Sequence, residues 1–271
     1  MSRVFSGSRS DKRKPRPAVR HRRLVCELLE DRRMLELGDL LLTLDDPSAN
    51  AQDSCSFGYA VAADGGLTVV GAPYANVGGA AYTGVAYVFN STTGALVATL
   101  NNPTPASGDY FGRAVAVSGS TVVVGAPYDD TGATDAGSAY VFDAATGNLL
   151  RTLLNPTPAG DDDFGGAVAV SGSTVVVGVD GDDTGATDAG SAYVFDAATG
   201  NLLRTLNNPT PAAGDQFGFS VAVSGSTIVV GAHRDDTGAT DAGAAYVFDA
   251  ATGNLLRTLL NPTPALADKF G

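Results

Sequence analysis

From residue 57 onward, short apolar runs and polar turns recur at a nearly constant interval. Phe-Gly pairs begin at Phe57, Phe111, Phe164, Phe217 and Phe270, which are 54, 53, 53 and 53 residues apart. The units that start at Phe111 and Phe164 are identical at 45 of 53 positions, so they must adopt the same structure. Repetition at this period is typical of solenoids, propellers and related arrays.

The unit that starts at Phe111 predicts four β-strands. They are Ala114–Val117, Thr121–Val124, Ser138–Asp143 and Asn148–Leu153. The first two are joined by Ser118-Gly119-Ser120, a sequence typical of a tight hairpin. The Asn-Pro-Thr-Pro segment after the fourth run cannot continue a ladder, because proline has no backbone N–H. Each unit is therefore predicted to be a four-stranded antiparallel meander.

The second strand of this unit, with Val122, Val123 and Val124, is apolar without alternation, which indicates a strand covered on both faces. Stacking such sheets around an axis covers both faces, so we predict an all-β fold, a β-propeller of four-stranded antiparallel blades. Phe111, with Tyr140 and Phe142, is expected to fill the space between blades. A β-solenoid is the competing architecture, but the tight hairpins disfavour it because its strands are parallel.

The two ends of the array do not match complete units. Leu40–Leu44, followed by Asp-Asp-Pro, resembles Leu202–Leu206 followed by Asn-Asn-Pro, which predicts an isolated fourth strand. Phe270-Gly271 resembles the start of another unit. Four complete repeats, starting at 57, 111, 164 and 217, thus form either a four-bladed ring with a spare strand or part of a larger ring. The unfinished fifth unit favours part of a larger ring.

Charge divides the chain into a basic tail and an acidic body. Residues 1–36 carry eleven Lys/Arg and five acidic residues, a net +6, whereas the remainder carries six and 24, a net −18. We therefore place a separate tail, disordered or helical, at 1–37 and the repeats at 38–271. The acidic body argues against nucleic-acid binding, which needs a basic face. No run of 18 apolar residues predicts a transmembrane segment.

The recurring Phe-Gly, Thr-Val-Val-Val-Gly-Ala-Pro and Ser-Ala-Tyr-Val-Phe-Asp sequences resemble the FG-GAP repeat, the blade unit of propellers like those of integrin α-subunits. Gly71-Ala72-Pro73 and Gly125-Ala126-Pro127 match the motif fully, and the later units depart from it. Relatives that bind calcium carry a D-x-D-x-D-G loop between the first two strands. This chain has Ser118-Gly119-Ser120 there, so the resemblance implies no calcium cage, and no cofactor is expected.

The tail carries a second resemblance. Leu29-Glu30-Asp31-Arg32-Arg33-Met34-Leu35 is similar to the L-E-x-R-x-x-L segment near the N-terminus of many planctomycete extracellular proteins. That resemblance implies a sorting segment and a secreted or cell-surface protein. The alternative is a short basic amphipathic helix without a specific role.

Two kinds of loop residue are candidates for binding. The loop after the second strand carries three aspartates in three units, which could supply oxygen ligands to a cation such as calcium, or could only form turns. These are Asp129, Asp130, Asp135, Asp182, Asp183, Asp188, Asp235, Asp236 and Asp241. Just before it, the residues vary between units, as a ligand-contacting loop would. The candidates for that ligand face are Tyr74, Tyr128, Asp180, His233 and Arg234.

Catalytic chemistry is poorly represented. The only histidines are His21 and His233, and repetition supplies no unique nucleophile and base. The expected function is therefore a non-catalytic adhesion or binding module that contacts a protein or glycan through a propeller face. The alternative is a structural protein whose blades are completed between chains through the unpaired Leu40–Leu44 segment.

Overall fold

A computed structural model describes residues 40–48 and 55–271. The chain divides into two units, Met1–Leu41 and Leu42–Gly271, and the second contains every strand described below. The predicted sorting segment Leu29–Leu35 lies outside the described residues.

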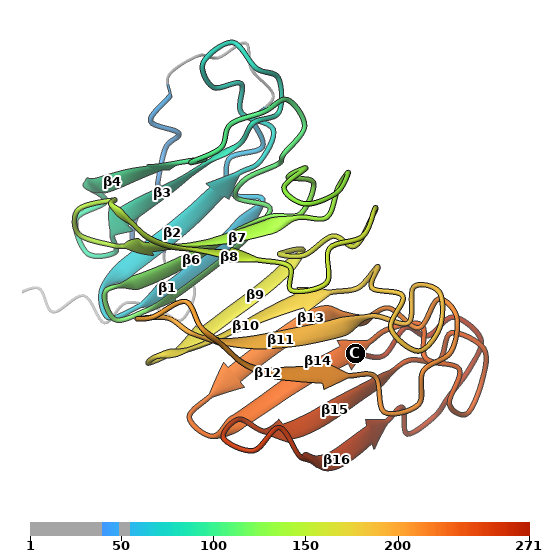
Figure 1. Cartoon of the computed structure of the whole chain (residues 1–271). Coiled ribbons are helices and arrows are strands. Elements are labelled where there is room, and N and C mark those ends of the chain that lie inside the picture. Colours follow the sequence, from blue (N-terminus) through green and yellow to red (C-terminus); the bar gives the residue numbers. More distant parts are fainter. Residues whose placement is uncertain (1–39, 49–54) are drawn as a thin grey trace, which may run out of the picture. The chain divides into compact units, whose positions relative to one another are not determined.

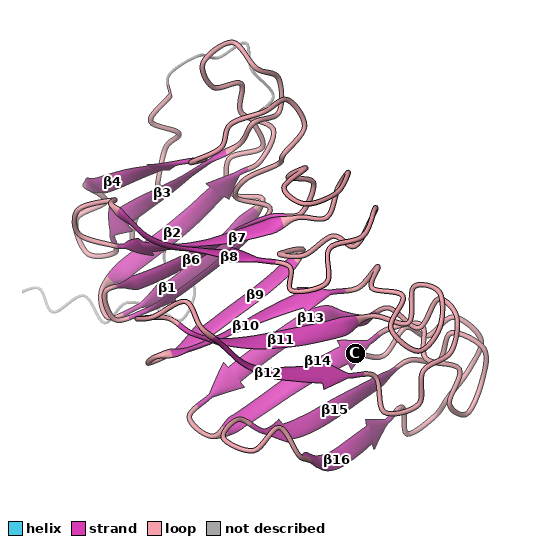
Figure 2. Cartoon of the chain, viewed as in Figure 1, coloured by secondary structure: helices cyan, strands magenta, loops and turns pink. Residues whose placement is uncertain are grey.

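Sixteen strands form four separate antiparallel sheets (Figures 1 and 2). The first sheet contains β1 Ala60–Asp64, β2 Leu67–Ala72, β3 Val85–Asn90 and β4 Leu96–Asn101; the second contains β5 Ala114–Ser118, β6 Thr121–Ala126, β7 Ser138–Asp143 and β8 Leu149–Leu154; the third contains β9 Ala167–Ser171, β10 Thr174–Val179, β11 Ser191–Asp196 and β12 Leu202–Asn207; the fourth contains β13 Phe217–Ser224, β14 Thr227–Ala232, β15 Ala244–Asp249 and β16 Leu255–Leu260. Strand order within each sheet follows the sequence, as a meander requires. The described part of the chain has no helix, so none that is long and apolar enough to cross a membrane.

Local sequence explains each sheet. Ser118 pairs with Thr121 across a two-residue turn in which Gly119 has a φ of 57°, the left-handed conformation that such turns need. At the turn between β7 and β8, the Asp143 carboxylate accepts hydrogen bonds from the backbone N–H and the hydroxyl of Thr146. The fourth strand starts at Leu149, one residue later than predicted, because Asn148 closes this turn by accepting from the Asp143 N–H.

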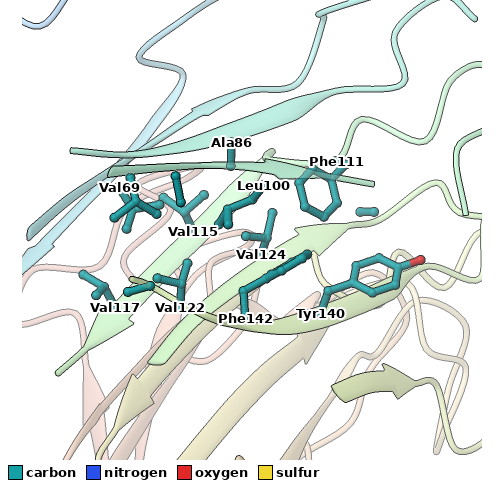
Figure 3. Packing of buried hydrophobic residues seen from close by; sticks show 14 residues of the cluster. Val69, Ala86, Leu100, Phe111, Val115, Val117, Val122, Val124, Tyr140 and Phe142 are labelled. Atoms are coloured by element: carbon teal, nitrogen blue, oxygen red, sulfur yellow. The ribbon is translucent and has the colours of Figure 1, made fainter. Parts of the chain in front are cut away.

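The sheets pack on one another through buried side chains (Figure 3). Between the first two sheets, Phe111 is fully buried, and its ring centroid lies 5.7 Å from that of Tyr140 and 5.8 Å from that of Phe142. Leu100 and Val69 of the first sheet belong to the same cluster. The predicted role of Phe111 between blades is therefore confirmed, and equivalent clusters form around Phe164 and Phe217.

The inner strands also follow one another: β1 lies beside β5, β5 beside β9, and β9 beside β13. Among the described strands, β13 has no comparable contact with β1. The four sheets of this unit are therefore successive propeller blades that do not close into a ring.

Glycines permit the closest approach between blades. A Cβ atom on Gly125, in β6, would lie 2.0 Å from the carbonyl oxygen of Gly165, which belongs to the Phe-Gly pair of the next unit. Gly71 and Gly178 stand in the same relation to Gly112 and Gly218. The Gly of each Gly-Ala-Pro segment, or of its variant, thus contacts the Phe-Gly pair of the following unit, which explains why both sequences recur.

The acid two residues before Phe-Gly fixes the connection between blades. Asp109 is 2% exposed, and its Oδ2 accepts hydrogen bonds from Asn102 Nδ2 at 2.6 Å and from the Ala106 N–H at 2.7 Å. Asp162 and Asp215 make the same pair of bonds with Asn155 and Asn208 and with the backbone of the same loop. These carboxylates stabilise the turn that leads into each inner strand.

The segment Leu40–Leu44 is not a strand, which corrects the prediction. A ladder needs a neighbouring strand, and no strand among the described residues pairs with this segment. Leu44 nevertheless packs against the first sheet, next to Tyr87 and Phe89. Its apolar pattern was therefore a correct sign of packing, although not of hydrogen bonding.

Candidate functional site

The differences between near-identical repeats are concentrated at a few positions. The units that start at Phe111 and Phe164 differ at eight places. These are Arg113/Gly166, Ala126/Val179, Pro127/Asp180, Tyr128/Gly181, Leu154/Asn207, Gly160/Ala213, Asp161/Gly214 and Asp163/Gln216. Several of them flank a Phe-Gly pair or follow the second strand of a blade. Both places lie at the same end of a blade, because the first strand starts where the antiparallel second strand ends.

A cavity of about 210 Å³ opens at this end of the inner strands. It is lined by Tyr59, Arg113, Pro127, Asp163, Gly166, Asp180 and Phe219. All seven stand at positions whose residues differ between units. They converge because the residue after Phe-Gly leads into the inner strand, and the inner strands of neighbouring blades lie side by side. Residues with no sequence motif in common therefore share one site.

Tyrosines form a continuous cluster beside the cavity. The ring centroids of Tyr74 and Tyr110 are 5.1 Å apart, and those of Tyr110 and Tyr128 are 5.3 Å apart, both edge to face. Tyr59 packs on Tyr74, and Tyr82 stacks on Tyr110 with nearly parallel rings. We call Tyr59, Tyr74, Tyr82, Tyr110 and Tyr128 the tyrosine cluster.

Arg113 connects the tyrosine cluster to the acidic side of the cavity. Its guanidinium carbon lies 5.9 Å from the ring centroid of Tyr59 and 5.5 Å from that of Tyr128, which is the range of cation–π attraction. Its charge also acts on the carboxylates of Asp163 and Asp180. The side chain is thus held between aromatic rings and acids.

The carboxyl groups of Asp163 and Asp180 both line this cavity. Burial, together with the neighbouring charge of Asp180, raises the pKa of Asp163 to about 7. Burial likewise raises the pKa of Asp180, against the opposing charges of Arg113 and Arg234. The charge of the cavity therefore changes near neutral pH.

The backbone before each Phe-Gly pair is in an uncommon conformation. Asp163 has a φ of 62°, and Tyr110 and Gln216 have φ values of 52° and 54°. Residues other than glycine rarely adopt this left-handed conformation, and it is frequent at functional sites. The backbone N–H of Asp163 donates to the Asp135 carbonyl, and that of Tyr110 to the Tyr82 carbonyl. These bonds fix the direction in which the variable side chains extend.

The fourth blade contributes a different pair of rings. The centroids of Phe219 and His233 are 3.9 Å apart, and His233 is buried without a hydrogen-bond partner at Nδ1. Burial, with the charges of Arg234 and Lys269, lowers the pKa of His233, so the ring is neutral at physiological pH.

The family model of the FG-GAP repeat matches residues 96–142, 152–195 and 208–248. Each match covers most of one blade-sized unit, and the Gly–Gly contacts described above occur between the residues that define the motif. The chain is an FG-GAP repeat protein. No curated protein matches the chain. The crystal structure of the computationally designed Ika4 protein is similar at 22% identity and a TM-score of 0.48, and the match covers 78% of this chain and 98% of that one.

In this FG-GAP chain, one of the five residues predicted for the ligand face lines the cavity, and the other four are not among its lining residues. Asp180 lines it, Tyr74 and Tyr128 belong to the tyrosine cluster, and His233 packs on the lining residue Phe219. The charge of Arg234 acts on Asp180. The site also contains residues beside the Phe-Gly pairs that were not predicted, although they vary visibly between units. These are Tyr59, Arg113, Asp163, Gly166 and Phe219.

The aspartates considered for metal binding take part in turns and in contacts between blades. Asp129 accepts from the Thr131 N–H through Oδ1, and from Tyr140 and Thr104 through Oδ2. Asp130 accepts from the Asp135 N–H, and the later two units repeat both turn bonds. Within residues 40–48 and 55–271, no three acidic, histidine or cysteine side chains converge on a metal-sized site.

Proposed function

We propose that this FG-GAP chain is a non-catalytic binding module of a secreted or cell-surface protein. Its protein or glycan ligand contacts the cavity and the tyrosine cluster. The observation that carries this proposal is the location of the variable residues. In repeats that are otherwise nearly identical, three of the eight positions that distinguish the units starting at Phe111 and Phe164 contribute residues to one cavity. These residues are Arg113 and Gly166, Pro127 and Asp180, and Asp163.

The chemistry of the site suits recognition. Tyrosine and arginine are enriched among the residues that dominate binding energies, because they offer large contact areas together with hydrogen-bonding groups. The tyrosine cluster is partly exposed, with Tyr59 at 48% and Tyr82 at 46%. Asp163 and Asp180 add acceptors for hydroxyl, amide or ammonium donors.

Catalysis has little support. His233 is the only histidine among the described residues, and its Nδ1 has no hydrogen-bond partner. A general base needs an orienting partner and a nucleophile within reach. A binding role requires only a surface that is complementary to the ligand.

The test exchanges residues between repeats. The variant Arg113→Gly, Asp163→Gln, Asp180→Pro places at each position the residue that another unit already carries there, namely Gly166, Gln216 and Pro127. The full-length wild type and this variant are screened against immobilised glycans and a displayed peptide library. The matched control is Leu154→Asn, which copies Asn207 at a varying position outside the cavity lining.

We expect the wild type and the control to select the same ligands, and the triple variant to bind them at least about 10-fold more weakly, the loss of one or two good contacts. Equal binding by all three proteins would refute the site. The absence of any glycan or peptide ligand would refute the binding function itself.

A further inference from the structure

The cavity of the candidate site lies where one repeat lacks a side chain. The residue after Phe-Gly is Tyr59, Arg113, Gly166 or Phe219 in the four units, and all four line the cavity. Their backbones are held alike, because each N–H donates to the carbonyl three residues earlier. The φ of Gly166 is not positive, so the backbone conformation does not need glycine there. Three units place a long side chain on this frame, and the third unit leaves space instead.

This space is small and has an aromatic ring at each end of its lining. Its volume of about 210 Å³ is below the about 300–1,000 Å³ of pockets for drug-sized ligands, so it admits one ring-sized group. Tyr59 leads into β1, and Phe219 lies in β13. These are the first and the last of the four described inner strands, which follow one another side by side.

Between the two aromatic rings, the lining is polar. A Cβ atom on Gly166 would lie 3.2 Å from the Asp163 carbonyl oxygen and 3.4 Å from Asp180 Oδ1, so the space borders both residues directly. In the described part of the chain, no other side chain donates a hydrogen bond to the carboxylate of Asp163 or Asp180. Both carboxylates can therefore accept from a ligand, and the guanidinium of Arg113 can donate to one.

The charge of this lining is small at neutral pH. Burial and the charge of Asp180 raise the pKa of Asp163 to about 7, so its carboxyl group is only partly ionised. The positive charge of Arg113 opposes that of Asp180. A charged ligand of either sign would meet a group of its own sign here, which disfavours it. A neutral ligand with several hydroxyl groups can donate to the carboxylates and accept from the guanidinium.

We propose that the cavity binds one neutral sugar ring of a glycan. A pyranose ring suits both parts of the lining. Its hydroxyl groups donate and accept hydrogen bonds, and its C–H groups, which carry partial positive charge, pack on the negative face of an aromatic ring. This inference rests on the binding function proposed above and names the ligand class of the same site.

The test measures the binding of methyl glycosides to the full chain by saturation-transfer NMR and isothermal titration. The probes are the methyl glycosides of glucose, galactose and mannose, with the amino-sugar and uronic-acid analogue of each. We expect at least one neutral glycoside to bind with a Kd of about 1–10 mM, the affinity that a small ligand of this size reaches. Its two charged analogues should bind at least about 3-fold more weakly, because each brings a charge next to one of its own sign.

The variant Gly166→Tyr tests the position of the sugar. It fills the space with the residue that Tyr59 provides in the first unit, and it removes no lining side chain. We expect glycoside binding to weaken at least about 10-fold. The matched control Gly160→Ala changes a glycine outside the lining to the residue that Ala213 provides, and should bind like the wild type.

A second variant, Asp180→Asn, keeps the shape of the cavity and replaces a charged acceptor by a neutral one. It should weaken glycoside binding about 5-fold, the difference between hydrogen bonds to charged and neutral acceptors. Thermal melts verify that each variant folds, and Asp180→Asn decides the test if Gly166→Tyr does not.

Three results would overturn the proposal. The first is a charged analogue that binds more tightly than every neutral glycoside. The second is glycoside binding that the folded cavity variants leave unchanged. The third is no response to any neutral glycoside. In that case the screen described above separates the two proposals, because a selected peptide that the triple variant no longer binds would retain the binding function and refute only the sugar.

Discussion

The carbonyl oxygen of Gly165 lies 2.0 Å from the position that a Cβ atom on Gly125 would occupy. Real Cβ atoms do not approach backbone oxygens so closely, so β6 of one blade and the Phe-Gly pair of the next can meet only where glycine stands. The repeated glycine of β6 and its equivalents is therefore a packing requirement between units and not a turn residue, since the φ of Gly125 is not positive.

Replacing Gly125 by alanine should force the second and third blades apart. We expect the free energy of unfolding to fall by about 3 kcal/mol or more, the upper range for inserting a methyl group into a packed interior. Urea unfolding measures this change. Gly160→Ala is the matched control, since its Cβ would meet only the Thr134 oxygen at 3.7 Å and the next unit already has Ala213 there. Equal loss in both variants would contradict the close-approach argument.

The neighbouring leucines Leu153 and Leu154 of β8 should differ sharply in their contribution to the free energy of unfolding. Leu153 is 1% exposed and packs between the second and third blades, whereas Leu154 is 46% exposed. Leu153→Ala is expected to lower the free energy of unfolding by about 2–5 kcal/mol, and Leu154→Ala by less than about 1 kcal/mol. Similar effects of the two substitutions would show that β8 does not face the next blade as described.

Stability should increase on mild acidification. Burial raises the pKa of Asp109 to about 6, and it also raises those of Asp162 and Asp215, above the value near 3.9 for an unfolded chain. The folded state then binds protons more tightly, so the free energy of unfolding rises as pH falls from 8 through 6.

Asp129 has the opposite effect on the pH dependence of stability, because its pKa is lowered on folding. Burial alone would raise its pKa, but hydrogen bonds from Thr131, Tyr140 and Thr104 lower it, so its contribution is lost below about pH 4. Melting temperatures between pH 3 and 8 should therefore peak between about 4 and 6. In Asp109→Asn, where Oδ1 can still accept both bonds, the change between pH 5 and 7 should be smaller. A melting temperature that rises steadily up to pH 8 would contradict the raised pKa values of Asp109, Asp162 and Asp215.

In the first unit, Cys55 Sγ donates to Asp46 Oδ2, whereas in the later units an asparagine donates to an aspartate at the equivalent positions. Two substitutions can restore the asparagine–aspartate pair in the first unit. In the double variant Asp46→Asn, Cys55→Asp, an amide would donate to a carboxylate as Asn208 does to Asp215. A hydrogen bond to a charged acceptor contributes about 1.5–3 kcal/mol, more than a thiol donor provides, so the double variant should unfold at higher urea concentration. Cys55→Asp alone places two carboxylates together and should destabilise the first blade. If both variants were equally stable, the correspondence between the Asp46–Cys55 contact and the asparagine–aspartate pairs of the later units would be wrong.

Repetition made most of the fold predictable. The strand Ser138–Asp143 has the predicted bounds, and the buried roles of Phe111 and Tyr140 followed from apolar runs in a repeated frame. Leu40–Leu44 had the right side chains for a fourth strand, but hydrogen bonding depends on a neighbour that no local pattern reveals.

The site was only half predictable. Asp180 and His233 stood out because the loop after the second strand varies, whereas Arg113 and Asp163 flank a motif that has an evident structural purpose. These two kinds of position, from different units, come together because the inner strands of neighbouring blades pack side by side. No local sequence pattern reveals that packing.

The most direct test of the recognition site is hydrogen–deuterium exchange of the full chain with and without a selected ligand. The cavity and the tyrosine cluster predict slower exchange on binding in segments 56–59, 110–113, 163–166 and 180–182. The turns at the opposite end of the blades, 118–120 and 144–147, should exchange as they do without ligand. Protection confined to those opposite turns would contradict a ligand site built from the residues that distinguish the repeats.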